Sequence, residues 1–505
     1  MVDLYEDATP SPADLIRSIS EQGYSLQAAL ADLIDNSVSA KSNKIEIVVS
    51  TDSQPYILFM ADDGIGMDDN ELAAAMKLPS QSPINKRSSH DLGRFGLGMK
   101  TASFSQARKF TVLSRKKGHV EYSARTWDLN VLEQGHWRIT VNSGSDKTKL
   151  LGLYRDTSKL FLNAYTDFEP NTIVVWHGLY KFEEFVTEKN RKETLFKELK
   201  EIIAEHLSIV FHRFLEQRNN NLQIRLNNTH IKPFNPFPTR LKDFRSLEPR
   251  TRDFHENDIS IEGFILPARA ITESKAGNSE WTTKYLGLLD MEGIYVYRAG
   301  RLISIGGWGS LVKKTSKHQL ARLRVDIGNN SDLHLHLNVA KSQVKIPDDL
   351  RPAFTAYIKD LKKEAFREYH NKIIKQSIKK GASNEELLQV VPTSRGSTFE
   401  INKNFLLFKT ATDGLNKIQS LSLKAMIRLL TVKLNMIKES HQPALFPVTI
   451  SDEDPNPITE EDLLTIVKEL SKGGMSKKAI RNDFIRDLGY DKTSIPSTVV
   501  QFLEQ

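Results

Sequence analysis

The sequence contains no cysteine among its 505 residues. This absence excludes a disulfide-bonded scaffold, cysteine-ligated zinc sites and a thiol nucleophile, and it fits a reducing compartment. No run of residues approaches the roughly 18 apolar positions that a membrane-spanning helix needs. The N-terminal stretch MVDLYEDATPSPADL is acidic and lacks the apolar core of a signal peptide. We therefore expect a cytoplasmic protein that neither spans a membrane nor is secreted.

The chain also lacks a dominant charge. It has 70 Lys and Arg against 63 Asp and Glu, which gives a formal net charge of +7. A hydrophobic content of 39% and a charged content of 26% are typical of folded soluble proteins. The length predicts two to four domains. The small basic excess permits contact with nucleic acid without requiring it.

Hydrophobic periodicity predicts an ordered series of helices and strands. Two helices broken at Gly23 are followed by strands, a polar Ser-rich loop and a helix that begins at a glycine cluster. Strands return after a long helix, and the C-terminal third reads as helical, with a polar linker inside it. The expected elements are helices at 12–40, 70–77, 99–105, 191–215, 351–380 and 403–438, strands at 44–50, 56–61, 109–115, 120–127 and 172–176 and within 222–346, and a linker at 381–398.

Asp32 and Asn36 lie four residues apart in the helical stretch ALADLIDNSVSA, so both point to one face. A carboxylate and a carboxamide one turn apart suit a magnesium–nucleotide site. The acid orients or deprotonates a water, and the amide oxygen ligates the metal beside phosphate and water oxygens. Taken alone, the same pair would be read as a polar helix face.

Two further motifs follow in the chain. A predicted strand runs into Asp62, which precedes Gly64, Gly66 and Met67 in DDGIGM, and two glycines after an acid allow a tight turn and close approach of the backbone to a ligand. Next comes LGRFGLGMKT at 92–101, where glycines would leave backbone N–H groups to bind phosphates at a helix N-terminus. This run is not a P-loop, because Met99 stands before Lys100 and no strand precedes it.

The three motifs, in this order and context, resemble the N, G1 and G2 boxes of the GHKL superfamily, whose members include the ATPase chain of DNA gyrase, the heat-shock chaperone, histidine kinases and MutL. The resemblance implies an α+β Bergerat fold, a mixed sheet with helices on one face and ATP between them. It implies Asn36 on magnesium, Asp62 on adenine, Thr172 at the adenine end and residues 79–90 as a lid over ATP. The implied phosphate-binding residues are Gly93, Arg94, Phe95, Gly96, Leu97, Gly98, Met99 and Lys100.

Within the superfamily the chain is most similar to prokaryotic MORC-like and MutL-like ATPases. GIYVYRAGRLI at 293–303 resembles part of the MORC transducer domain, and LHLHLNVAKSQVKIP at 333–347 looks like the loop that delivers a lysine to the γ-phosphate. By this likeness Lys341 is the sensor lysine, with Lys345 as its competitor. A lysine suits the task, since it brings a point charge on a flexible stem.

One departure from the family concerns the catalytic acid. Related hydrolysing members usually carry Glu where this chain has Asp32, and a displacement of about 1 Å can cost ~100-fold in rate. Slow hydrolysis, or an ATP-gated switch that does not hydrolyse, is therefore an open alternative. Asp35 points away from the face shared by Asp32 and Asn36 and is assigned no role.

The expected domains are a GHKL ATP-binding domain at 1–185, an S5-like α/β transducer at 186–350, a basic helical region at 351–440 and a small helical tail at 441–505. The expected function is a Mg-dependent ATPase that forms a homodimer on binding ATP and acts as a clamp in DNA repair, restriction or defence. Basic segments at 313–324 and 351–380 would contact DNA, and the C-terminal region would take DNA or a protein partner. A chaperone-like ATPase is the alternative, whereas a histidine kinase would need a phosphoacceptor helix pair before the ATP domain.

Overall fold

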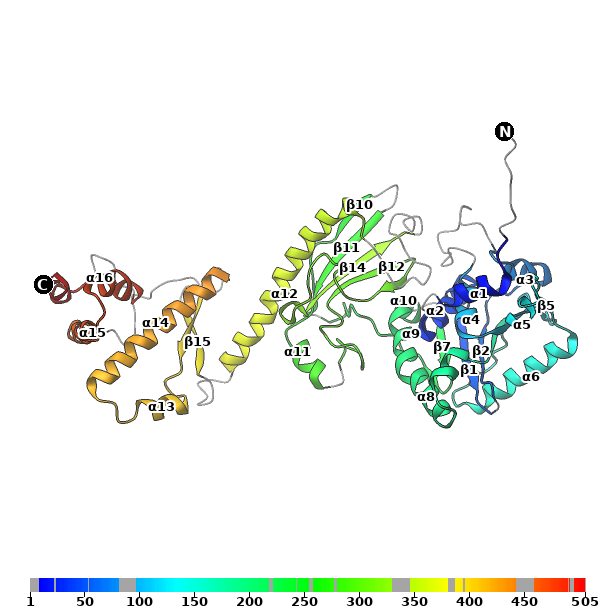
Figure 1. Cartoon of the computed structure of the whole chain (residues 1–505), viewed down its shortest axis with the longest axis horizontal. Helices are drawn as coiled ribbons and strands as arrows, with labels where there is room; N and C mark the ends of the chain where they lie inside the picture. The colour runs from blue at the N-terminus through cyan, green and yellow to red at the C-terminus, as the bar shows by residue number, and fades with distance from the viewer. Residues whose placement is uncertain are drawn as a thin grey trace, which may run out of the picture. The chain divides into compact units, whose positions relative to one another are not determined.

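The structure is a computed structural model of the whole chain (Figure 1). It describes residues 9–21, 24–52, 54–80, 97–217, 221–241, 243–253, 258–276, 279–328, 346–379, 387–393, 396–441, 458–488, 490 and 495–504. The chain divides into two compact units, Met1–Tyr369 and His370–Gln505. No helix within the described ranges is long and apolar enough to cross a membrane.

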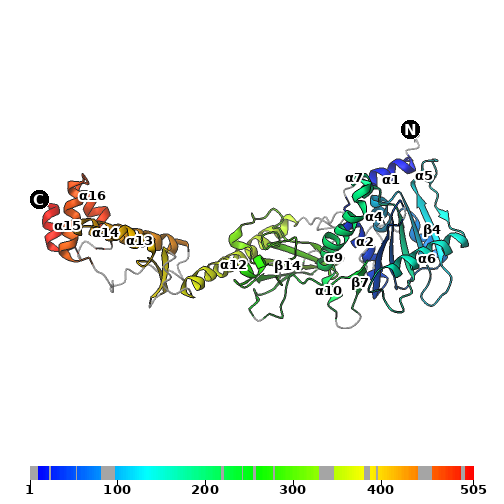
Figure 2. The same ribbon diagram turned by 90° about the horizontal axis from the view of Figure 1, so that it is seen from below.

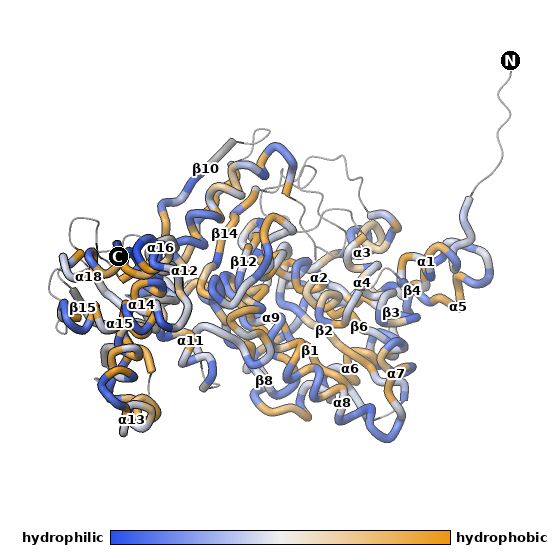
Figure 3. Tube along the Cα trace, turned by 60° about the vertical axis from the view of Figure 1, so that its left-hand side comes forward, coloured by the Kyte–Doolittle hydropathy of each residue, from blue (hydrophilic) through white to orange (hydrophobic). Residues whose placement is uncertain are grey.

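The first unit begins with an eight-stranded mixed sheet in the order β5-β4-β3-β6-β2-β1-β7-β8. All neighbouring strands run antiparallel except β1 and β7, which pair in parallel. Figure 3 shows β1 and β2 as hydrophobic strands in its centre. The strands are β1 (Lys44–Ser50), β2 (Ile57–Asp62), β3 (Lys109–Ser114), β4 (Ser123–Asp128), β5 (Thr140–Val141), β6 (Thr172–His177), β7 (Gln223–Leu226) and β8 (Thr229–His230).

Most of the helices of this domain pack on one face of the sheet. Alternate residues of β1, β2, β3 and β6 point to that face and are apolar, so they form a core with the helices. The helices of this layer are α1 (Pro12–Ser20), α2 (Leu26–Ser39), α3 (Asp69–Met76), α4 (Gly98–Gln106), α5 (Leu129–Leu132), α7 (Tyr180–Phe185), and the long segment formed by α8 (Arg191–Lys197), a π-helix at Glu198–Ile203, α9 (Ala204–Val210) and α10 (His212–Leu215). This arrangement confirms the expected Bergerat-type fold.

One helix lies on the opposite face. α6 (Gly144–Leu160) packs Tyr154 against Phe59, and Figure 2 shows it across the sheet from α2 and α4. A capping box of Ser143 and Asp146 begins this helix. Beneath it the buried Glu46 of β1 pairs with Arg225 of β7 and accepts a hydrogen bond from Tyr154 at 2.8 Å. Because β7 and β8 belong to this sheet, the first domain extends past the boundary expected at residue 185.

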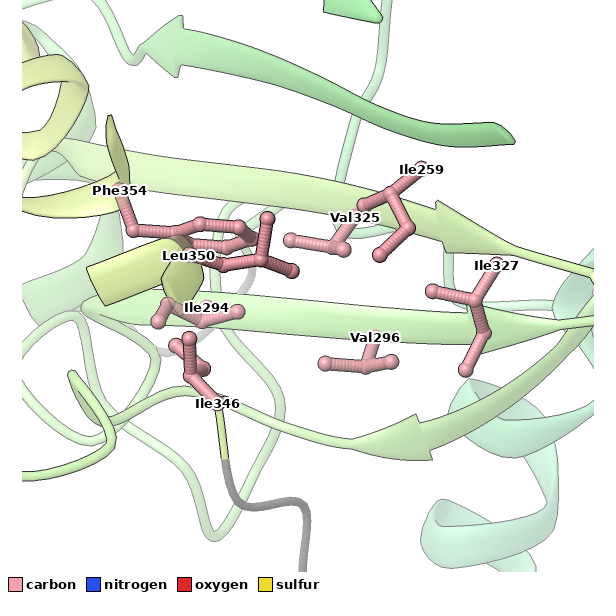
Figure 4. A pocket seen from close by; sticks show the side chains of 8 residues that line it. All are labelled: Ile259, Ile294, Val296, Val325, Ile327, Ile346, Leu350 and Phe354. Carbon is pink, nitrogen blue, oxygen red and sulfur yellow. The ribbon is translucent and has the colours of Figure 1, made fainter. Parts of the chain in front are cut away.

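The second sheet follows in the order β10-β11-β14-β12-β13, with β9 paired to β11. The N-terminal part of α12 (Arg351–Lys379) packs on it. Figure 4 shows a small apolar pocket between this sheet and the start of α12, lined by residues such as Ile294 and Phe354. The strands are β9 (Arg245–Ser246), β10 (Arg250–Asp253), β11 (Asp258–Ile265), β12 (Gly293–Arg298), β13 (Arg301–Ser304) and β14 (Ala321–Ile327), and a short helix, α11 (Ala270–Glu273), lies between β11 and β12.

The second unit joins a hairpin to a helical core. β15 (Leu388–Thr393) and β16 (Gly396–Ile401) pair antiparallel where a polar linker was expected, so that expectation is wrong for this stretch. Apolar residues of α14 pack with α15, with a π-helical stretch at Ile480–Phe484, and with α17 and α18, so the tail shares its core with α14 rather than beginning a separate one at residue 441. The helices are α13 (Leu406–Thr412), α14 (Lys417–His441), α15 (Glu460–Lys472), α16 (Lys477–Ala479), α17 (Ile485–Asp487) and α18 (Ser497–Glu504).

Candidate functional site: a nucleotide pocket on α2 and β2

Asp32 and Asn36 lie on α2. The N-cap residue of this helix is Ser25, whose side chain accepts a hydrogen bond from the backbone N–H of Ala28. Asp32 is buried, and Asn36 is exposed one turn later. The amide nitrogen of Asn36 donates to the backbone carbonyl of Asp32 at 3.1 Å. Its amide oxygen, the atom expected on magnesium, accepts no hydrogen bond from any residue in the described ranges.

The Asp32 carboxylate is held from two sides. The Tyr24 hydroxyl donates to one of its oxygens at 3.0 Å, and a guanidinium nitrogen of Arg301 lies 3.5 Å from the other. Burial, together with the charge of Asp32, raises the pKa of Tyr24, so this hydroxyl keeps its proton. Arg301 comes from β13 in the second sheet. The side chain of Asp35 is buried as well, and its Oδ1 lies 2.7 Å from Nε of the same arginine.

Asp62 stands at the end of β2 with its carboxylate buried. Its Oδ1 accepts hydrogen bonds from the Gly64 N–H at 2.9 Å and the Ser42 hydroxyl at 3.1 Å, and its Oδ2 accepts one from Ser37 at 2.9 Å. Burial raises the pKa of Asp62, while these three donors act in the opposite direction. A carboxylate oxygen has two lone pairs, so Oδ2 retains an acceptor position for a ligand N–H.

The loop after Asp62 is fastened to the neighbouring strands. Gly66 has φ +64°, and the Met67 N–H donates to the Ser114 hydroxyl at 2.9 Å. Ser114 lies 2.8 Å from the Thr172 hydroxyl, and Thr172 pairs with Asp62 in the ladder between β2 and β6. The structure thus brings Thr172 next to Asp62, and its role at the adenine end stays a prediction.

The predicted phosphate-binding run is described only from Leu97 onward. Gly98 begins α4, and a Cβ at this position would meet no atom of the described residues within 4 Å. The Lys100 amine, in contrast, is buried and donates to the carbonyl of Ala75 at 2.8 Å. Burial lowers the pKa of Lys100 to about 8. This part of the site therefore presents backbone atoms to a ligand, and not the amine of Lys100.

Several predicted residues lie outside the described ranges. These are the glycine-cluster residues Gly93, Arg94, Phe95 and Gly96, the sensor candidate Lys341 with its competitor Lys345, and most of the expected lid. Their roles therefore stay predictions.

The sequence did not indicate the residues that hold the two carboxylates, namely Tyr24, Ser37, Ser42 and Arg301. It also did not indicate Ser114 and Asn171, which hold the loop after Asp62. Asn171 donates to the carbonyl of Gly64 at 2.7 Å and so fixes the loop from the β6 side. Ser37 follows Asn36 on α2 and could have been noticed by that position. Nothing in the local sequence indicated Arg301, which reaches Asp32 from 269 positions away.

Comparison with known proteins agrees with this geometry. Residues 24–151 match the family described as histidine kinase-, DNA gyrase B-, and HSP90-like ATPase. The matched segment contains Asp32, Asn36, Asp62 and the start of α4. The chain contains a GHKL ATPase domain.

The GHKL domain also resembles curated proteins named DNA mismatch repair protein MutL. Over 124 residues it is 27% identical to that of Rickettsia prowazekii (strain Madrid E) and 25% identical to that of Rickettsia akari (strain Hartford). Each alignment covers 24% of this chain and only 20% of the relative. The chain thus spans about a fifth of the length of the curated relatives it matches.

The residues of this GHKL domain fit the nucleotide and metal that the family implies. The acceptor position on Asp62 suits an amino group, and the outward amide oxygen of Asn36 is a ligand type that magnesium accepts. Within the described ranges no group of three or more acidic or histidine side chains could hold a metal by itself. A magnesium ion on Asn36 would therefore take its other ligands from phosphate and water.

Proposed function

We propose that the chain is a magnesium-dependent ATPase that works as an ATP-gated dimeric clamp in DNA repair, restriction or defence. The observation that carries this proposal is the pairing of Asp32 with Asn36 on one face of α2, inside a GHKL domain that already fits a nucleotide. Bound magnesium would supply charge neutralisation at the phosphates. Asp32 would orient or deprotonate the attacking water, and Lys341 would contact the γ-phosphate.

The DNA part of the proposal rests on charge and on the name of the relatives. Of the basic segment 313–324, Arg322 is buried and donates to backbone carbonyls, and Arg324 pairs with Glu262. These two arginines stabilise the fold and do not serve a DNA surface. The cations that stay exposed in this segment are Lys313, Lys314 and Lys317.

Lys313 and Lys317 lie against α12, while the amine of Lys314 donates to the carbonyl of Asp290 at 2.8 Å. The amine of Lys362 donates to the carbonyl of Lys313 at 3.1 Å, and the amine of Lys317 lies 6.0 Å from the centre of the Phe366 ring. Lys359 and Lys363 are exposed on the same helix. Such a cluster attracts phosphate backbones without reading sequence, and binding to it would weaken with salt.

A non-hydrolysing switch is the second candidate, and two contacts of Asp32 favour it. The proposed base Asp32 is shorter than the usual Glu and is already engaged by Tyr24 and Arg301 at 3.0 and 3.5 Å. Such a chain would bind ATP, and the clamp would close, without hydrolysis of the ATP.

Steady-state ATP hydrolysis with magnesium, with and without duplex DNA at two salt concentrations, tests the proposal. The proteins are wild type, Asp32→Asn, a triple Glu variant of Lys313, Lys314 and Lys317, and a matched triple Glu variant of exposed lysines on the first domain, Lys189, Lys192 and Lys200. We expect Asp32→Asn to abolish turnover and DNA to stimulate wild type at low salt.

Loss of the three clustered lysines should reduce the salt slope of DNA affinity by about 2.7, at ~0.9 per phosphate contact. The matched triple should leave the slope unchanged. Turnover indifferent to DNA would favour a chaperone-like ATPase that acts on proteins. If wild type binds ATP but does not hydrolyse it, the non-hydrolysing switch would be the remaining candidate function.

A further inference from the structure

The hairpin formed by β12 and β13 brings an arginine of the second sheet to the α2 helix. Arg298 and Arg301 pair across the turn, and the two residues between them, Ala299 and Gly300, have φ +47° and +85°. Two successive residues with positive φ are typical of the type I′ turn, which keeps a hairpin tight. A Cβ on Gly300 would lie 3.4 Å from the Phe214 ring of α10. The hairpin tip is therefore seated closely against the first domain.

Arg301 joins two buried carboxylates on that helix. Its side chain is 6% exposed, and those of Asp32 and Asp35 are 3% and 1% exposed. Nε lies 2.7 Å from Asp35, whereas Nη2 lies 3.5 Å from Asp32. Nε of Arg301 and Oδ1 of Asp35 form a close ion pair without hydrogen-bond geometry, whereas Nη2 donates a long hydrogen bond to Asp32. The shorter ion pair makes Asp35 the anchor. The longer contact reaches the acid proposed to act on water.

This geometry has a direct consequence for the acid. Buried charges are stabilised by opposite charges, and the Arg301 side chain lies between the two carboxylates. The Tyr24 hydroxyl holds the other oxygen of Asp32 at 3.0 Å. The orientation of this carboxylate is therefore set from the first domain by Tyr24 and from the second by Arg301.

We propose that Arg301 is a positioning residue for ATP hydrolysis: anchored on Asp35, it orients the Asp32 carboxylate, so turnover depends on docking of the β12–β13 hairpin against α2. The inference rests on the proposed function, because it takes Asp32 as the acid that acts on water. Arg301 is not assigned a contact with nucleotide. Displacing the Asp32 carboxylate by about 1 Å would suffice for a ~100-fold loss of rate.

The test separates turnover from nucleotide binding in the full-length protein. The constants kcat and KM and the ATP dissociation constant, the last by calorimetry, are measured for wild type, Arg301→Met, Arg301→Lys and Asp35→Asn. We expect Arg301→Met and Asp35→Asn to lower kcat at least tenfold while the dissociation constant changes less than about threefold. Arg301→Lys should be intermediate, since it keeps the charge but loses the fork geometry.

A matched control removes another arginine–aspartate pair across the same pair of domains. Arg213 of α10 contacts Asp326 of β14 at 2.5 and 3.2 Å and touches neither Asp32 nor Asp35. Arg213→Met should lower the apo melting temperature but leave kcat within about twofold of wild type. If it lowers kcat as much as Arg301→Met does, general packing between the domains sets turnover and the proposal is overturned.

The double variant Arg301→Met with Asp35→Asn gives a further criterion. If the two residues act as one unit, its kcat should be no lower than that of the worse single variant, whereas additive losses would contradict the anchor. Loss of ATP affinity in parallel with kcat would also refute the positioning role. Measuring Asp32→Asn in the same assay distinguishes failure of the proposed function from failure of the Arg301 inference. If Asp32→Asn retains turnover, the proposed function fails. If it abolishes turnover while the Arg301 variants do not alter kcat, only the present inference fails.

Discussion

Gly66 is the position where one added methyl group should damage the nucleotide pocket most. At φ +64° an alanine is strained, at a cost of about 1 kcal/mol. In addition, its Cβ would lie 1.8 Å from the carbonyl oxygen of Arg115, where contacts under 3.0 Å are essentially never found. The atom met is backbone, so either the loop or the end of β3 must move. Forced overpacking of this kind typically costs a further 1–3 kcal/mol, roughly.

The displacement would directly reach Asp62, the residue proposed to contact adenine. Two residues earlier, the Gly64 N–H donates to Asp62 at 2.9 Å, and the Arg115 N–H donates to the Asn171 carbonyl at 2.8 Å. We therefore expect Gly66→Ala to lower the free energy of unfolding by about 3 kcal/mol, or the melting temperature of this domain by roughly 6–12 °C. ATP affinity should fall at least tenfold, because the Asp62 carboxylate loses its present orientation.

Gly118→Ala is the matched control. Gly118 also has a positive φ, +87°, but its Cβ would meet nothing within 4 Å. It should show only the backbone cost of about 1 kcal/mol, or roughly 2–4 °C, with unchanged ATP affinity. Differential scanning fluorimetry and calorimetric ATP titration measure both quantities. Equal losses for the two variants would refute the argument, since the contact with the Arg115 carbonyl would then contribute nothing.

Two further predictions concern buried charges. The pKa of Lys100 falls from 10.5 to about 8 in the folded protein, so between these values the unfolded chain holds a proton that the folded chain has released. The free energy of unfolding of wild type should then rise relative to Lys100→Met from pH 8 to 10.5, by ~3 kcal/mol at most, in urea titrations at several pH values. Parallel pH curves would contradict this. Arg225→Met should cost about 3–5 kcal/mol by leaving the Glu46 carboxylate buried without its cation. A double-mutant cycle with Glu46→Gln should show coupling, and strictly additive losses would rule out the pair as a unit.

Much of the first domain was predictable because its signals are local. The strand at 44–50 was placed with the bounds of β1, and the two helices expected within 12–40 correspond to α1 and α2. Period-two and period-3.6 patterns need only neighbouring residues, which is why these elements could be read without a structure. α6 was missed, although Ser143 and Asp146 form a capping box, since its exposed residues weaken the apolar pattern. The hairpin of β15 and β16 was missed because a polar composition was taken for a linker.

By itself, the sequence determined the motif set: Asp32 and Asn36 one helical turn apart, Asp62 at the end of a strand, and glycines where the backbone must turn tightly. These relations follow from helix and strand geometry and from the glycine conformation. Only the tertiary structure decided which side chains hold those carboxylates. Ser37 and Ser42 converge on Asp62, and Arg301 reaches Asp32 from the second sheet, because packing of distant segments brings their polar atoms together. Such partners share no sequence period with the residue they contact, so no local pattern could reveal them.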